Sequence, residues 1–381
     1  MLARRCLAIR NQKLRWVRLE KPRFGVLYSR APTRRMTVDD RTRSQAIAWA
    51  KAGDQEAFAG LVESHRRELH VHCYRMLGSF DEAEDLVQET FLRAWQGREG
   101  FRGGPGFRAW LYRIATNACL DFLSLHPRPL LTAARPGTGS VPPPAAVPWL
   151  QPYPDGLLKE IPSDQDEPET VFIAKETIEL AFLAAIQYLT PRQRAVLILR
   201  DVLGWSARET AELLGVSVPS VTSGLQRARL TMRTHLPQHR LEWTSATDAG
   251  DVERAVVQRY MDALQRADED AVALVLCEDA KVGHQGGSGG HTGAEPVWFE
   301  GREAVIEAWA PILHGPDAQD LRFIPTRANM QPAVATYVSN PGASDFRAFA
   351  LAVLRVEGEL VADVTIFGSK AFAAFELPEA L

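Results

Sequence analysis

The sequence predicts a chain of several domains: two all-α domains, the second a helix-turn-helix, followed by an α+β domain. Three observations lead to this fold class. Apolar residues recur with the helical period from Ala46 to His126, two short capped helices flank Gly215, and runs typical of strands follow Leu321. At 381 residues the chain has the length of two or three domains of ordinary size.

The helix-turn-helix is expected within residues 190–236. Ser206 begins a capping box, in which a hydroxyl and a glutamate three residues later satisfy each other's backbone N–H groups. The first helix then runs over Ala207–Leu214 and ends at Gly215, because glycine tolerates the left-handed conformation. Ser217 caps the second helix, whose first turn accepts a proline. The unit is therefore expected to be two short helices joined by a tight turn.

The second of these helices carries one apolar and one polar face. The apolar residues, expected to be buried, are Val218, Val221, Leu225, Ala228 and Met232. The polar candidates for contacts with DNA are Ser220, Ser223 and Arg227 opposite that stripe, Gln226 beside them, and Arg229 and Arg233 at its flanks. Hydroxyl and guanidinium groups suit base edges and phosphates. An ordinary helical hairpin with a solvated arginine face is the alternative.

Composition excludes several classes of protein. Hydrophobic residues make up 46% of the chain and charged residues 24%, and no apolar run reaches the roughly 18 residues that span a bilayer. The four cysteines are far apart, which indicates neither a disulfide framework nor a zinc site and fits a reducing cytoplasm. A net charge of −3 argues against bulk attraction to nucleic acid, so DNA contacts must come from local patches.

Residues 1–45 form a basic N-terminal extension that is expected to be disordered. The first 35 residues hold eleven Lys and Arg against a single carboxylate, Glu20. A basic arm and an Arg-rich transit peptide are both compatible with this composition. A third alternative is that translation begins at Met36, and we favour this or plain disorder.

The first helical block, residues 46–126, contains two candidate surfaces. In Phe80–Gln96 the polar residues gather on one side, where solvation alone is the common explanation; they are Asp81, Asp85, Gln88, Glu89 and Arg93. A glycine-rich bend follows, and then Arg108–Leu125 carries Trp110, Tyr112, Arg113 and Asn117. Aromatic and arginine side chains beside a loop can hold unpaired bases, although they can equally be core. His70 and His72 do not share a helix face, which favours core packing over a metal site.

Three blocks in this order, DEAEDLVQETFLRAW, FRAWLYRIATNACLDFL and LTPRQRAVLILRDVLGWSARETAELLGVSVPSVTSGLQRAR, resemble RNA polymerase sigma factors of the sigma-70 family, extracytoplasmic-function (ECF) type. The resemblance implies a region-two domain at 46–126 and a region-four helix-turn-helix domain at 172–240. It implies core RNA polymerase, through its β′ clamp helices and β flap, and promoter DNA as partners, with an anti-sigma factor or a small ligand as further candidates. No cofactor, metal or membrane contact is implied.

The resemblance also assigns roles to residues. Asp85, Gln88 and Glu89 would dock on the β′ clamp helices. Residues 98–121, including Tyr112, Arg113 and Asn117, would melt and read the minus-ten element. The second helix of the helix-turn-helix would read the minus-thirty-five element. Family members often carry cations where this chain has Thr222 and Gly224, so upstream binding is expected to be weaker or differently specific.

Residues 127–171 read as a proline-rich, acidic linker, long for this family. Its acids (Asp155, Glu160, Asp164, Asp166, Glu167 and Glu169) resemble a linker that threads toward the polymerase active-site channel. Disorder explains the composition nearly as well.

Residues 251–381 are expected to form the α+β domain. Helices are expected at Val252–Ala267, Ala271–Cys277 and Glu303–Leu313, a glycine loop at His284–His291, and strands at Leu321–Thr326, Ala333–Val338, Phe346–Val356 and Leu360–Phe367. The pattern resembles the SnoaL-like, ketosteroid-isomerase-like cone that some ECF sigma factors carry at the C-terminus.

Such cones often enclose a pocket, so polar candidates for catalysis are His284, His291, Asp363 and Glu300. Catalysis needs groups that converge on one substrate, which the sequence does not indicate. We therefore expect a transcription initiation factor regulated by its C-terminal domain and no enzyme. The alternative is a DNA-binding sensor or small-molecule enzyme that uses the cone pocket.

Overall fold

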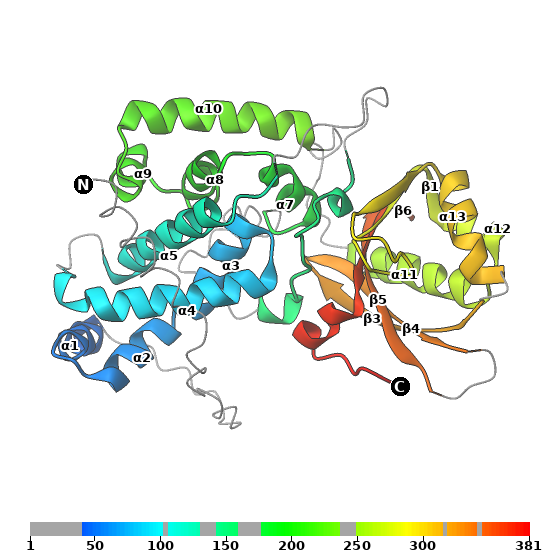
Figure 1. The fold of residues 1–381 in the computed structure, drawn as a ribbon, viewed down its shortest axis with the longest axis horizontal. Helices are drawn as coiled ribbons and strands as arrows, with labels where there is room; N and C mark the ends of the chain where they lie inside the picture. Colours follow the sequence, from blue (N-terminus) through cyan, green and yellow to red (C-terminus); the bar gives the residue numbers. More distant parts are fainter. Residues whose placement is uncertain are drawn as a thin grey trace, which may run out of the picture. The chain divides into compact units, whose positions relative to one another are not determined.

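The computed structural model describes residues 40–101, 106–129, 142–158, 177–236, 249–314, 318–340 and 345–381 (Figure 1). It divides into two compact units, Met1–Gln45 and Ala46–Leu381, and the contacts below all lie within the second. Three expectations fall outside the described residues: the N-terminal extension up to residue 39, the glycine bend at 102–105, and most of the acidic linker.

The first domain is all-α, as expected. Its helices are α1 (Asp40–Lys51), α2 (Gln55–Glu63), α3 (Arg66–Leu77), α4 (Phe80–Gly97) and α5 (Gly106–Leu125). Helix α3 is buried along most of its length, because α4 and α5 pack on it. Ser79 caps α4 by accepting a hydrogen bond from the backbone N–H of Glu82. His70 and His72 are both buried, as expected of core residues.

The second domain is the helix-turn-helix. It comprises α7 (Leu180–Gln187), α8 (Pro191–Leu197) with a π turn at Ile198–Val202, α9 (Ala207–Leu214) and α10 (Val218–His235). The capping box at Ser206 is present, and Gly215 adopts φ 63°, which a residue with a side chain rarely adopts. The bounds of α9 and the Ser217 cap of α10 are those expected from the sequence.

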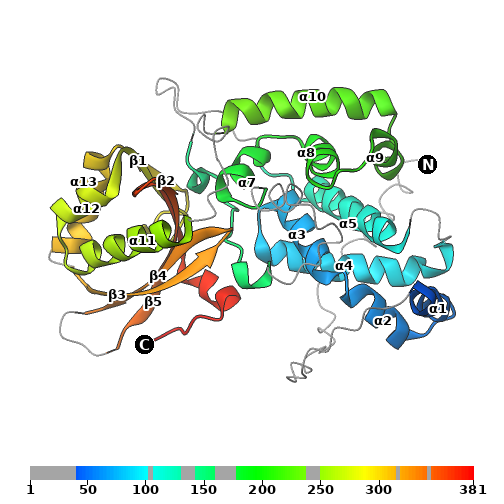
Figure 2. The same ribbon diagram turned by 180° about the vertical axis from the view of Figure 1, so that it is seen from behind.

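The C-terminal domain, residues 249–381, is a curved sheet with helices on one face. Its six strands have the order β2-β1-β6-β5-β4-β3, and only β1 and β6 pair in parallel among these strands. The strands are β1 (Leu276–His284), β2 (Val297–Glu300), β3 (Asp320–Ala328), β4 (Gln331–Ser339), β5 (Arg347–Glu357) and β6 (Leu360–Gly368). The helices are α11 (Ala249–Gln265), α12 (Glu269–Val275) and α13 (Arg302–His314) (Figure 2).

The four strands expected after Leu321 are confirmed, and two expectations in this domain are wrong. Ala271–Cys277 is not one helix, since α12 ends at Val275 and β1 begins at Leu276. His284 is not a loop residue, because it ends β1 and pairs with β6. Charged residues at 278, 279 and 281 conceal the apolar alternation of β1, so the sequence pattern alone does not reveal this strand.

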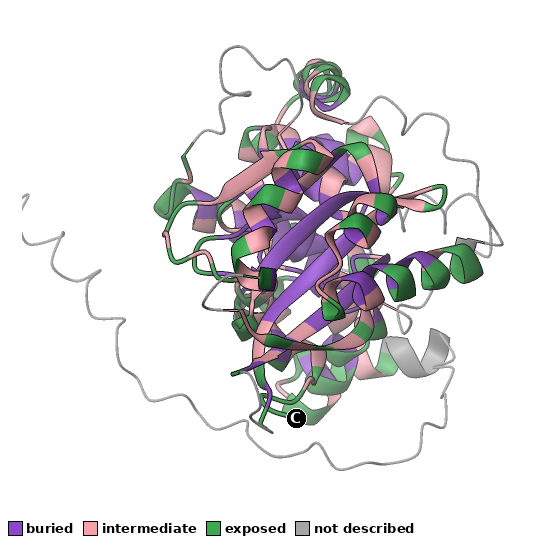
Figure 3. Ribbon diagram, turned by 90° about the vertical axis from the view of Figure 1, so that its right-hand side faces the viewer, coloured by how far each residue is buried: buried purple, intermediate pink, exposed green. Residues whose placement is uncertain are grey.

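The two faces of the sheet belong to different cores. One face packs on α11–α13 through a cluster that includes Tyr260, Trp309 and Leu354. The opposite face, with Leu351 and Phe367, joins the core that also contains the helical domains. Buried residues therefore run along the central strands on both sides (Figure 3). This arrangement explains why β4, β5 and β6 are apolar almost without interruption.

Part of the linker lies between the helical domains and the sheet. Residues 142–158 include two short 3₁₀ turns, Pro144–Ala146 and Asp155–Leu157, and many of their apolar side chains are buried, among them Val147, Leu150 and Tyr153. An extended or disordered linker was expected from the proline content. In the described part a further turn, closed by the Leu150 N–H bond to the Val147 carbonyl, follows the first 3₁₀ turn, and only the residues after it up to 154 are extended. No helix of the described residues is both long and apolar enough to cross a bilayer.

Candidate functional surfaces

Helix α4 presents a polar surface whose members were identified from the sequence. Asp85 and Gln88 are exposed, while Glu89 is half-buried and accepts a hydrogen bond of 2.7 Å from Arg93 Nε. The opposite side of the helix, including Leu86 and Val87, is buried. The surface is therefore presented by a helix whose own core packing holds it in place.

The sequence reasoning missed two features of this surface. Leu92 is 51% exposed and follows Gln88 by one turn, so an apolar side chain continues the polar row. Arg93 also contacts Asp121 of α5 at 2.7 Å, which ties the two helices together. A large exposed leucine on an otherwise amphipathic helix is the signal that the sequence offered.

Helix α5 carries the three candidates for reading the minus-ten element in different environments. Arg113 is exposed and Asn117 is half-buried. Tyr112 is only 2% exposed, and its hydroxyl donates to Glu68 Oε2 at 3.2 Å. Burial raises the pKa of this phenol. In this arrangement the ring of Tyr112 is a core group and offers no face to a base.

The helix-turn-helix domain covers part of α5. The ring of Trp205, which precedes α9, lies 5.9 Å from that of Tyr112, centroid to centroid. Helices α8 and α9 both contact α5. The structure is therefore a closed arrangement, in which the second domain shields one side of the first.

Helix α10 exposes most of its predicted DNA-contacting residues. Ser220, Gln226, Arg227 and Arg233 are exposed and Ser223 is half-buried. Arg229 is also exposed, but its guanidinium makes a bidentate ion pair with the carboxylate of Asp201, with distances of 2.7 and 2.9 Å. The sign and geometry of this face suit a negatively charged partner.

Two details of α10 change the picture drawn from the sequence. Val218 is not buried but 43% exposed, because it occupies the first turn, beyond the packing surface of α8. Gly224 is buried, and a methyl group there would lie 3.9 Å from Val196. A side chain at position 224 would therefore point toward α8 and away from the exposed face of α10. The absence of a cation at this position thus removes no contact from that exposed face. Thr222 is exposed.

The four polar candidates of the C-terminal domain do not all share one face of the sheet. His284 is paired with Ile366, on the face that packs on α11–α13, whereas Asp363 is paired with Lys281 on the other face. His291 contacts the carbonyl of Glu295 at 2.7 Å and is half-buried. A general acid and a general base cannot act on one substrate from opposite faces of a sheet.

Asp363 instead belongs to a row of alternating charges across four strands. Glu300, Lys281, Asp363 and Arg355 are neighbours in register on β2, β1, β6 and β5. Lys281 lies 3.5 Å from Glu300, and Arg355 lies 3.8 Å from Asp363. Opposite charges at neighbouring cross-strand positions stabilise the pairing of the strands.

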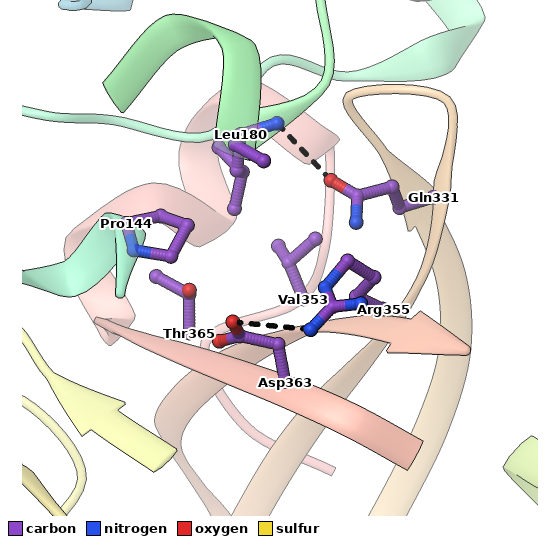
Figure 4. Close-up of a pocket in the computed structure, with 8 residues that line it drawn as sticks. Pro144, Leu180, Gln331, Val353, Arg355, Asp363 and Thr365 are labelled. Atoms are coloured by element: carbon purple, nitrogen blue, oxygen red, sulfur yellow. Dashed lines mark hydrogen bonds and ion pairs between the residues drawn. The ribbon is translucent and has the colours of Figure 1, made fainter. Parts of the chain in front are cut away.

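A small pocket adjoins this row (Figure 4). Its walls come from the sheet, from Pro144 of the linker and from Leu180 of α7, and it has room for about one water molecule. Asp363 is 8% exposed, and its Oδ1 has no hydrogen-bond partner among the described residues. Burial raises the pKa of this carboxyl to about 6. Pockets for small-molecule substrates are far larger, about 300–1,000 Å³.

Comparisons with known proteins match both helical domains and the chain as a whole. The model of sigma-70 region 2 matches residues 61–126, and that of sigma-70 region 4 matches residues 179–232. The ECF RNA polymerase sigma factor SigG of Mycobacterium tuberculosis is 38% identical over 333 residues, covering 85% of each chain. SigW of Bacillus subtilis, also an ECF sigma factor, is 32% identical over 191 residues, covering 50% of this chain and 94% of SigW.

A solved structure extends the likeness to the fold. The ECF sigma factor SigJ of Mycobacterium tuberculosis matches with a TM-score of 0.53 and 21% identity, covering 84% of this chain and 99% of that chain. At this identity the match concerns fold alone. It includes the C-terminal domain, since the two helical domains make up too little of the chain to account for the coverage.

Proposed function

The chain belongs to the ECF-type RNA polymerase sigma factors of the sigma-70 family, and from this premise we propose how its described surfaces divide the work. As a sigma factor it is a transcription initiation factor that binds core RNA polymerase and directs it to promoters. We place this activity in the cytoplasm, where core polymerase acts. The first helical domain is region two and the helix-turn-helix is region four.

Polymerase docking is assigned to α4. Asp85 and Gln88 are exposed on a helix whose other side is packed against the core. Glu89 lies beside them and accepts a hydrogen bond from Arg93. Leu92 adds an apolar contact next to the polar ones. Polar groups around one exposed apolar side chain have the character of a protein interface. This exposed face is the observation that best supports the proposal.

Promoter recognition is assigned to α5 and α10. The exposed Arg227, with Ser220 and Gln226 beside it, would enter the major groove of the minus-thirty-five element. Arg113 and Asn117 would contact the melted minus-ten element. Tyr112 can join them only after region four moves away from α5, because Trp205 now packs on its ring. Opening of the closed arrangement is therefore part of the proposed mechanism.

We assign a regulatory role to the C-terminal domain and no catalysis. The sheet of this domain shares a core with the helical domains. The position of the C-terminal domain would therefore favour or oppose the separation of regions two and four. A small-molecule enzyme or sensor is the alternative function. The placement of His284 and Asp363 on opposite faces of the sheet weighs against it.

Run-off transcription with core polymerase tests the proposal. Full-length protein should direct transcription from a cognate promoter, and a chain cut after Thr247 should differ from it several-fold. Equal activity of the two chains over a range of core concentrations would remove the regulatory role. Turnover of candidate ligands would then be the next measurement, and absence of any promoter-directed transcript would refute the central assignment.

A further inference from the structure

We propose that the surface that docks on core RNA polymerase spans two helices, and that α5 supplies its second half. The residues of this two-helix surface are Asp85, Gln88, Glu89 and Leu92 of α4 and Asp121 and Leu125 of α5. Arg93 lies between the two halves and positions Glu89. The two-helix surface rests on the proposed function of α4 as the docking helix, and it extends that interface to a helix so far assigned only to promoter DNA.

Leu125 lies beside the stretch of α4 that carries the docking candidates. Two ion pairs cross-link α4 to α5 and to the residues just after it: Arg93 contacts Asp121 at 2.7 Å, and Arg128 contacts Glu82. The two helices therefore lie side by side and run antiparallel (Figure 1). Leu125 falls between the two cross-links, as do positions 85–89 of α4. It also follows Asp121 by one helical turn, so these two side chains share the face of α5 that borders α4.

Both halves of the surface carry a large exposed leucine. Leu125 is 76% exposed and Leu92 is 51% exposed. A single exposed leucine needs no explanation, since much of any protein surface is apolar. Here two of them flank the same polar row, and apolar side chains within a polar surround have the composition of a protein interface. The surface is therefore suited to a protein partner that offers an apolar groove.

Arg93 ties one carboxylate from each helix to a single guanidinium. Its Nε donates to Glu89 Oε1 and its Nη1 to Asp121 Oδ2, both at 2.7 Å. A planar guanidinium holds two carboxylates in far better defined directions than a lysine ammonium does. Glu89 is thus held in one orientation before a partner arrives. The ordering cost that binding imposes on a free side chain is reduced accordingly.

The charge of the surface indicates which partner it meets. Asp85, Glu89 and Asp121 carry three negative charges, against one positive charge on Arg93. Such an anionic surface repels the phosphates of DNA and attracts a basic protein surface. Arg113, the exposed cation assigned to promoter DNA, lies in the first half of α5 and is separate from this surface. The occupant is therefore a basic face of core polymerase with an apolar groove.

Titration of fluorescently labelled full-length protein with core polymerase tests the α5 half. Leu125→Ala should weaken binding about 5- to 30-fold, because most of a leucine side chain is then missing from the interface. Alanine is at least as good a helix former, so the unfolding free energy in urea should stay the same. Leu274→Ala is the matched control, since Leu274 is 75% exposed on α12 of the C-terminal domain. This control should bind core as tightly as the unaltered protein.

Arg93→Lys tests the positioning role, because it retains the charge and loses the fork that holds two carboxylates. Affinity for core should fall about 2- to 10-fold, the cost of ordering one freed side chain on binding. The same change should have little further effect when combined with Glu89→Ala, since the side chain that Arg93 positions is then gone. An equal loss with and without Glu89 would show a structural role or a direct contact and would overturn the positioning role. Arg254→Lys, whose arginine pairs with Asp251 on α11, is the control and should leave the affinity unchanged.

The outcomes distinguish failure of this surface from failure of the proposed function. If Asp85→Ala with Gln88→Ala weakens core binding and Leu125→Ala does not, docking is confined to α4; the two-helix surface is then refuted while the proposed function stands. If Leu125→Ala abolishes self-association in analytical ultracentrifugation and leaves the affinity for core unchanged, a second copy of this chain is the occupant, which also overturns the proposal. An unaltered protein that does not bind core at all refutes both.

Discussion

Replacement of Asp363 by asparagine should stabilise the protein at neutral pH and lose about half of this effect at pH 5. Burial of Asp363 raises its pKa from an ordinary value of 3.8 to about 6, against the opposing charges of Arg355 and Lys281. Between these two values the folded chain retains a proton that the unfolded chain has released. Stability is therefore highest below the unfolded pKa and falls as the pH rises toward 6.

The size of the effect follows from the shift of about two pKa units. At about 1.4 kcal/mol per unit, ionisation costs the folded protein about 3 kcal/mol above pH 7. About half of this cost is gone at pH 5. Asparagine has the shape of the protonated acid but gives up the contact with Arg355, so Asp363→Asn should raise the unfolding free energy by about 1–3 kcal/mol at pH 7.5.

Urea denaturation at pH 5, 6 and 7.5 measures this difference. The advantage of the asparagine variant should shrink by about 1 kcal/mol or more between pH 7.5 and pH 5. Asp345→Asn, at an exposed position, should show no such dependence on pH. An asparagine variant that is less stable at pH 7.5, or whose advantage is the same at every pH, would refute the reasoning from burial.

Three further predictions concern the functional surfaces. Asp85→Ala with Gln88→Ala should weaken core binding, measured by fluorescence titration, while helix content by circular dichroism stays the same. Arg227→Ala should cost about 1–3 kcal/mol of promoter binding if it reads a base, and the loss should then be greatest for promoters with the cognate upstream element. Truncation after Thr247 should change run-off transcription several-fold.

Each of these has an outcome that contradicts it. Unchanged affinity for core would remove α4 as the docking surface. A loss with Arg227→Ala that is equal on all promoters would indicate a phosphate contact, and no loss would mean that another face of α10 meets DNA. Arg208→Ala, on the exposed side of α9, is the matched control for loss of a cation. Equal transcription with and without the C-terminal domain would contradict the third prediction.

Local signals in the sequence predicted the helices and most strands, because caps and periodicity are properties of neighbouring residues. The capping box at Ser206 and the glycine stop at Gly215 are of this kind. Burial that depends on another domain was not predictable in this way. Tyrosine is a residue type that often contacts nucleic acid, so the sequence favoured Tyr112 as a contact. Only the packing of Trp205 shows that its ring is covered in this arrangement.

The linker is the clearest case of long-range control. Its prolines predict an extended chain, which is correct only for the few residues between the turn at 147–150 and the second 3₁₀ turn. Its burial depends on Asn329, a residue 176 positions from Tyr153. Asn329 is followed by Met330 and not by the glycine that marks tight hairpin turns, so the sequence gives no clear signal of the turn between β3 and β4. Nothing local indicates that this turn meets the linker, just as nothing near Lys281 of β1 or Asp363 of β6 indicates that the two side chains align in one row of charges.

Two-point attachment of the linker makes its length a constrained quantity. Tyr153 follows Ala145 by eight positions, and both ends of that span are fixed by contacts to one sheet. Each residue added to an extended chain lengthens it by about 3.3 Å, enough to carry a ring out of its aromatic neighbours. Homologous chains should thus vary in linker length outside this interval. Within the interval the number of residues should stay constant, because the span must match the width of the sheet between the two contacts.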